Sequence, residues 1–174
     1  MILPLTHQIL KKLPITTPQS SSVQPRFSIR ISVPNQRLEL LDGDAPLASY
    51  PISTSKYGLG SEDGSFRTPL GRFRVAEKIG DEAEPGMIFR GRRPTGTIAD
   101  QGGDEDHVLT RILWLDGLEP TNANTFDRYI YIHGTNQENL IGTAASHGCI
   151  RMRNADIVDL FPKVPAGTPV EIAA

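Results

Sequence analysis

The sequence has little cysteine, no long apolar run and no excess of charge of one sign. One cysteine in 174 residues excludes an internal disulfide. No run approaches the ~18 apolar residues that a membrane-spanning helix requires, so no integral membrane segment is expected. A formal net charge of −2, without a basic stripe, gives no support for a nucleic-acid partner. What is left is an ordinary globular chain, long enough for a core that needs no disulfides.

The N-terminus lacks the order of features that a secretory signal peptide shows. In MILPLTHQILKKL, Lys11 and Lys12 follow the apolar residues instead of preceding them, and Pro4 and His7 interrupt the segment. No small-residue cleavage site ends it. We therefore expect a cytoplasmic protein, or a periplasmic one if the assigned start hides a signal peptide.

Residues 1–26 differ in composition from the rest of the chain. The tract PITTPQSSSVQP offers little to bury, so residues 1–26 are predicted to be a flexible extension. Residues 27–174 are predicted to form one domain.

From residue 26 onward the pattern is typical of β-strands. In RFSIRISV, apolar residues alternate with polar ones, which is the period of a half-buried strand. Glycine and proline make up 30 of the 174 residues, which favours short strands joined by turns. The prediction is a mainly β domain, a sandwich or partly closed barrel with one or two short helices. Further strands are expected at 36–42, 43–54, 71–79, 108–119, 127–134 and 168–173.

Two segments depart from this pattern. Residues 155–161 have helical character, with Asn154 as the expected N-cap and Pro162 helping to end the helix. Residues 80–106 lack sustained periodicity, and a loop of this length is usually functional or mobile. It is either a lid over a site or a solvated insertion.

The only cysteine, Cys149, lies in ASHGCIRMRN, between a His-Gly pair and an arginine. A thiol with a pKa of about 8.5 is mostly protonated at neutral pH, and a nearby imidazole can accept its proton. His133 and His147 are the candidate bases. His133 ends the predicted strand beside Gly134, where a loop would leave room for substrate. His147 shares a face with Cys149 if that stretch is extended.

The neighbours of Cys149 suggest further roles. Gly148 allows a tight turn, and its N–H and that of Cys149 would stabilise an oxyanion. Ser146 would hold an imidazole in one tautomer through its hydroxyl. Arg151 and Arg153 are expected on the cysteine face, and the planar fork of an arginine suits a carboxylate.

Two other interpretations of the thiol remain open from the residues alone. A lone cysteine is often a small buried hydrophobe. Cys149, His133 and His147 would also make a three-ligand metal site. The chain has no Cys-x-x-Cys pair and no carboxylate beside these residues, so no metal and no cofactor are predicted.

The block IHGTNQENLIGTAASHGCIRM, residues 132–152, resembles the signature of the L,D-transpeptidase (YkuD-type) catalytic domain. That signature has a His-Gly pair, a spacer and then Ser/Thr-His-Gly-Cys. Upstream, TPLGRFRV at 68–75 resembles the Thr-Pro-x-Gly-x-Phe strand of the family. The resemblance covers roughly residues 27–172.

The resemblance implies a β-sandwich-like domain that performs cysteine acyl transfer on peptidoglycan stem peptides. Cys149 would be the nucleophile and His133 the general base. The bond attacked joins the third residue, a diamino acid, to a fourth D-alanine, which leaves as a thioester forms. His147, Gly148 and Ser146 would shape the pocket and oxyanion site, and Arg151, Tyr131 and Gly134 would bind substrate.

The expected partner is therefore a peptidoglycan-derived peptide or muropeptide, and the oligomeric state is left open. In the cytoplasm, water as acceptor would make the chain an L,D-carboxypeptidase of muropeptide recycling. The alternatives are an L,D-transpeptidase that crosslinks the wall or exchanges D-amino acids, and a non-catalytic peptide-binding module.

Overall fold

The computed structural model describes residues 26–174. The predicted extension, residues 1–26, lies outside them except for Arg26, which forms an ion pair with Asp42 at 2.7 Å. The strands are β1 (Phe27–Ser32), β2 (Arg37–Asp42), β3 (Ala45–Ser53), β4 (Gly71–Ile79), β5 (Met87–Arg90), β6 (Arg93–Ile98), β7 (Val108–Gly117), β8 (Tyr131–Gly134), β9 (Ile150–Met152) and β10 (Pro169–Ala173). The helices are the 3-10 turn η1 (Glu138–Leu140), α1 (Asn154–Leu160) and the 3-10 turn η2 (Phe161–Lys163).

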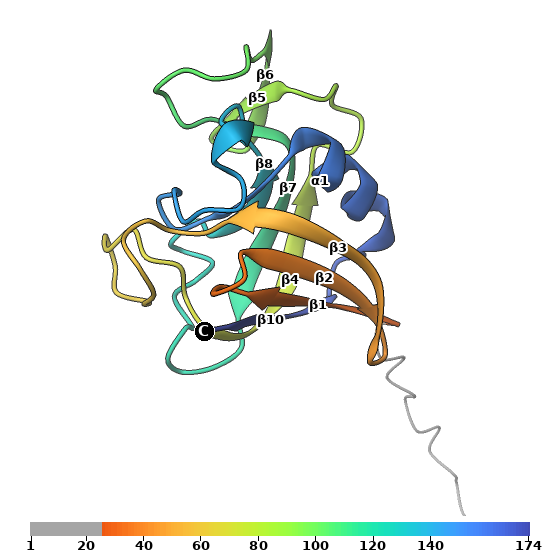
Figure 1. The fold of residues 1–174 in the computed structure, drawn as a ribbon, viewed down its shortest axis with the longest axis vertical. Coiled ribbons are helices and arrows are strands. Elements are labelled where there is room, and N and C mark those ends of the chain that lie inside the picture. The colour runs from red at the N-terminus through yellow and green to blue at the C-terminus, as the bar shows by residue number, and fades with distance from the viewer. Residues whose placement is uncertain (1–25) are drawn as a thin grey trace, which may run out of the picture.

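The strands close into a ring (Figure 1). The order is β4-β10-β1-β2-β3-β9-β8-β7, and β7 pairs again with β4 to make a barrel-like sheet of 8 strands. The β5–β6 hairpin is attached to β7 and stands beyond the ring. Strands hold 44% and helices 9% of the described residues, which confirms the mainly β prediction.

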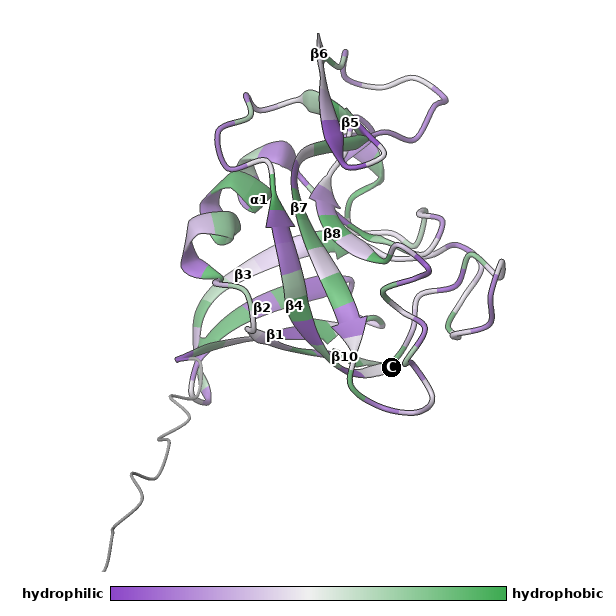
Figure 2. Cartoon of the chain, turned by 180° about the vertical axis from the view of Figure 1, so that it is seen from behind, coloured by the Kyte–Doolittle hydropathy of each residue, from purple (hydrophilic) through white to green (hydrophobic). Residues whose placement is uncertain are grey.

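Alternation of side chains decides which face of each strand is buried. On β1, Ile29 and Ile31 are buried while Arg30 between them is exposed. The same alternation gives β4 its hydrophilic and hydrophobic bands in Figure 2. On β8, Ile132 enters the main core, and its neighbour Tyr131 enters a second cluster with Phe89, Ile112 and Trp114. Cys149 packs against that second cluster.

The predicted N-cap was wrong by one residue. Asn154 is the first residue of α1, and extended Arg153 occupies the cap position without a side-chain cap. The Asn154 amide is used elsewhere: it donates to Thr135 O at 2.8 Å and to Glu138 Oε1 at 2.8 Å. These bonds tie α1 to the segment that follows β8.

The segment 80–106 is not the continuous loop that the sequence suggested. It contains the β5–β6 hairpin, and all residues of β6 are exposed. With no buried face, β6 shows no alternation of apolar and polar residues, which is why the strand could not be read from sequence.

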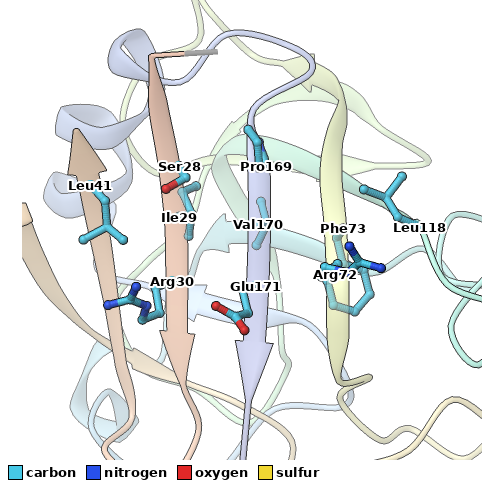
Figure 3. Close-up of a pocket in the computed structure, with 10 residues that line it drawn as sticks. All are labelled: Ser28, Ile29, Arg30, Leu41, Arg72, Phe73, Leu118, Pro169, Val170 and Glu171. Carbon is cyan, nitrogen blue, oxygen red and sulfur yellow. The ribbon is translucent and has the colours of Figure 1, made fainter. Parts of the chain in front are cut away.

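The outer face of the ring carries a shallow pocket of about 380 Å³ (Figure 3). A row of alternating charge crosses it, because Arg30 faces Glu171 on β10 and Glu171 faces Arg72 on β4. None of the residues lining it belongs to the block 132–152. This face is a solvated surface on which residues of opposite charge pair across neighbouring strands.

Candidate functional site

The parallel pairing of β8 with β9 brings the two halves of the motif together. Ile132 pairs with Ile150 and His133 with Arg151, so Cys149 arrives beside the start of β8. The Tyr131 N–H donates to Cys149 Sγ at 3.4 Å, and the thiol donates to Tyr129 O at 3.4 Å. His133 lies two residues beyond Tyr131 and therefore on the same face of β8.

The His133 imidazole is held in one tautomer. Its Nδ1 lies 2.6 Å from Gly134 O, and since a carbonyl only accepts, Nδ1 carries the hydrogen. The lone pair of the neutral ring is then on Nε2. Burial lowers the pKa of His133 below its ordinary value, so the imidazole is neutral at pH 7 and can accept a proton.

The Cys149 side chain is half-buried. Burial raises the pKa of its thiol to about 11, although the Tyr131 N–H and the charges of Arg151 and Arg128 act in the opposite direction. The site therefore holds a thiol and a neutral histidine at neutral pH. The thiol proton would have to leave as sulfur attacks, since a preformed thiolate is disfavoured.

A turn built by Ser146 and Gly148 presents the cysteine. The Ser146 hydroxyl donates to Cys149 O at 2.6 Å and accepts from the Gly148 N–H at 3.3 Å. Gly148 has a φ of +119°, a conformation that L side chains rarely adopt. Thr68, from the upstream TPLGRFRV motif, donates to Gly148 O at 3.0 Å and fixes the turn from the other side.

Ser146 therefore does not act as predicted. We expected its hydroxyl to orient an imidazole, but it braces the backbone around Cys149, and Gly134 O orients His133 instead. Two backbone N–H groups were expected to form an oxyanion site. The Gly148 N–H already donates a hydrogen bond to the Ser146 hydroxyl, whereas no described residue accepts a hydrogen bond from the Cys149 N–H.

Unlike the buried His133, His147 is exposed. Its Nδ1 lies 3.3 Å from Asp106 Oδ2, and its ring contacts the rings of Tyr57 and Phe66 at centroid distances of 5.7 and 6.1 Å. Within residues 26–174, no group of three or more His, Cys, Asp or Glu side chains is arranged to hold a metal ion. The Cys149–His133–His147 metal set therefore finds no support in the geometry.

Arg151 is 1% exposed and its charge is already matched. It donates to the Asp106 carboxylate and, at 3.0 Å, to Gln137 Oε1. The neighbouring Arg153 is exposed, so the two arginines do not share an environment as expected. The sequence did not predict the role of Asp106. Nothing in GGDEDH, residues 102–107, distinguishes the one carboxylate that contacts Arg151.

Gly134 and Tyr131, expected to bind substrate, are both buried. A Cβ on Gly134 would collide with Asn154 Oδ1, so the glycine serves the packing of α1 rather than an open space for a ligand. Tyr131 stacks edge-on against Trp114 at 5.6 Å, and Trp114 stacks flat on Phe126 at 3.8 Å. These rings form a wall next to the thiol.

Known proteins are similar to this chain over most of its described residues. Residues 26–172 match the L,D-transpeptidase catalytic domain family. YkuD of Bacillus licheniformis, a protein assigned to the L,D-transpeptidases, is 29% identical over 146 residues, which cover 84% of this chain and 65% of the relative. YcfS of Escherichia coli, which is also assigned to the L,D-transpeptidases, is 51% identical over 154 residues, which cover 85% of this chain and 44% of the relative. The chain thus spans less than two thirds of the length of these relatives.

Solved structures show the same fold. L,D-transpeptidase 3 from Mycobacterium tuberculosis, solved with a faropenem-derived adduct, superposes with a TM-score of 0.57 at 16% identity, over 86% of this chain and 61% of its own. An L,D-transpeptidase from Mycobacterium smegmatis superposes with a TM-score of 0.56 at 18% sequence identity, and the match covers 86% of this chain and 59% of that protein. No helix between residues 26 and 174 is long and apolar enough to cross a membrane. With nearly all of its described residues matched, the chain belongs to the family of L,D-transpeptidase catalytic domains.

Proposed function

We propose that the chain is a cysteine acyl-transfer enzyme that acts on the diamino acid–D-alanine bond of peptidoglycan stem tetrapeptides. One observation carries the proposal. Neutral His133 pairs with Arg151, two residues beyond Cys149, so its imidazole and the Cys149 thiol lie on the same face of β8 and β9, and no described residue bonds its Nε2. A nucleophile beside an oriented base is the arrangement that covalent catalysis requires.

The reaction follows from these groups. Cys149 Sγ attacks the scissile carbonyl carbon while His133 Nε2 takes the thiol proton, and the Cys149 N–H is placed to donate to the developing oxyanion. The imidazolium then gives its proton to the nitrogen of D-alanine, which leaves. A thioester between Cys149 and the shortened peptide remains.

Water is the acceptor that we propose for this thioester. The histidine that accepted the thiol proton can deprotonate water, and no second peptide needs to be bound. The product is a tripeptide acid, so the chain would act as an L,D-carboxypeptidase on muropeptides recycled in the cytoplasm. The alternative, an amine acceptor, makes it a transpeptidase of the cell wall.

The acceptor is identified by incubating the protein with a tetrapeptide, with and without an excess of a D-amino acid, and weighing the products. Tripeptide in both mixtures supports hydrolysis, whereas an exchanged tetrapeptide or a dimer supports transpeptidation. The Cys149→Ala variant must form none of these products. Turnover unchanged in that variant, or absent in the wild type, contradicts the catalytic proposal. Cell fractionation tests the cytoplasmic location separately.

A further inference from the structure

The tip of the β5–β6 hairpin carries an arginine in an unfavourable backbone conformation. Gly91 and Arg92 form a two-residue turn between the paired residues Arg90 and Arg93, and their φ values are +53° and +65°. Such turns favour glycine or asparagine, because a side chain with positive φ crowds its own backbone. Strain of this kind is retained where it serves a purpose.

The Arg92 side chain is directed to the wall of the site. Its guanidinium carbon lies 4.7 Å from the ring centre of Trp114 and 5.1 Å from that of Tyr129. Contact with the Tyr131 side chain raises the pKa of Arg92. Tyr129 and Tyr131 are the residues whose backbone atoms touch Cys149 Sγ. The β5–β6 hairpin, which Figure 1 shows beyond the ring, therefore contacts these aromatic residues through Arg92 at its tip as well as through Phe89 on β5.

The two arginines whose charges act on the thiol already have hydrogen-bond acceptors among the described residues. Arg151 is held by Asp106 and Gln137. Arg128 donates to the carbonyls of Gly60 and Arg67 and to Ser65. Arg92 has no carboxylate within ion-pair distance among residues 26–174, and Glu77 reaches it only through its longer-range field. A guanidinium placed over aromatic rings can still donate hydrogen bonds from its N–H groups to a carboxylate.

We propose that Arg92 binds a carboxylate at the end of the side chain of the third stem residue, and so selects peptides that carry one. Tyr129 and Tyr131 touch the thiol with backbone atoms and Arg92 with their side chains, so the group that Arg92 binds is expected to lie away from the scissile carbonyl. The end of a long side chain on the third residue suits such a position better than the carboxylate of the departing D-alanine, which is attached next to the scissile nitrogen. This inference rests on the proposed function, which supplies the stem peptide as the substrate.

Binding tests the inference without requiring turnover. In the Cys149→Ala background, we would measure the Kd of two tetrapeptides that differ only in a free or amidated carboxyl on the third side chain. Loss of a charged hydrogen bond is expected to weaken binding of the amidated peptide about tenfold or more. Adding Arg92→Gly, which suits the turn, should weaken the free acid equally and leave the amide unchanged. Arg92→Lys should give an intermediate loss.

Two controls make the outcome decisive. Arg93→Gln, at the next and exposed residue, should change neither Kd, and a peptide ending in D-alanine amide should respond to Arg92→Gly as the free acid does. Equal binding of the two peptides before any change at Arg92 overturns the inference. The inference is also overturned if Arg92→Gly weakens binding of peptides with a free D-alanine carboxylate but not of the peptide that ends in D-alanine amide. A wild type that binds selectively but does not turn over contradicts the proposed function alone.

Discussion

At the scale of single residues, burial keeps both His133 and the Cys149 thiol uncharged at neutral pH. Burial raises the pKa of Cys149 to about 11 and lowers that of His133 below 6.5. The Gly134 carbonyl accepts a hydrogen bond from His133 Nδ1, so the ring hydrogen stays on Nδ1 and Nε2 keeps its lone pair. Each group thus has the protonation state that its step needs, thiol for the attack and neutral imidazole for the base.

The pH dependence of kcat/KM follows from these two shifts. A histidine with a lowered pKa stays neutral down to pH values below 6.5, so activity should persist there and fall only at more acid pH. The thiol should limit activity only near pH 11.

A pH profile with a tetrapeptide checks both limbs, and the rate of alkylation of Cys149 in the free enzyme should rise toward the same alkaline limit. An acid limb centred at or above pH 6.5 would contradict the assignment of His133 as the buried base.

At the scale of elements, the segment between β6 and β7 belongs to the site and is fastened to it. Asn136 donates to Gly102 O at 2.7 Å and to Glu105 O at 2.9 Å, and Asp106 meets buried Arg151. Within the described chain, Asp106 Oδ1 and Arg151 Nε find no partner. The pair is therefore costly to break but not strongly stabilising as a whole.

Asp106→Ala is expected to lower the free energy of unfolding by about 3 kcal/mol, because it leaves the Arg151 cation buried without a counter-charge. Denaturant unfolding measures this loss, with Asp104→Ala on the same segment as a control that changes stability by less than ~0.5 kcal/mol.

Adding Arg151→Met to Asp106→Ala should restore part of the stability, since the uncompensated charge is then removed. If Asp106→Ala alone is as stable as the wild type, Arg151 does not depend on this carboxylate.

The elements also show what sequence can and cannot predict. The strand 71–79 was predicted with the bounds of β4, because alternation marks a strand buried on one face. The strand expected at 127–134 begins only at Tyr131, since Tyr129 has a φ of +57° and ends a turn. The motif located Cys149 and His133, but Asp106 and Arg92 reach the site through tertiary contacts that no local pattern encodes.

At the scale of the whole molecule, the C-terminal strand closes the ring. β10 lies between β1, to which it is parallel, and β4, to which it is antiparallel. Val170 and Ile172 on this strand are 2% and 1% exposed and belong to the main core. The last strand therefore connects β1, the first strand of the described residues, to β4, and this pairing completes the ring.

Deletion of residues 169–174 should prevent cooperative folding. It removes two buried side chains, each worth about 1.5–3 kcal/mol, and unpairs the edges of two strands, a loss comparable with a typical total stability. Thermal unfolding followed by circular dichroism tests this, and deletion of Ala174 alone, beyond β10, is the control. A cooperative transition in the longer deletion would show that the ring does not need its closing strand.

The central claim is that Cys149 becomes acylated by the peptide with loss of D-alanine. Intact-protein mass spectrometry after rapid acid quenching of a reaction with a tetrapeptide tests it most directly. We predict an adduct of the tetrapeptide mass less D-alanine, located on Cys149 and released by hydroxylamine, and absent from Cys149→Ala. D-alanine released at the same rate by wild type and Cys149→Ala, without an adduct, would contradict the account.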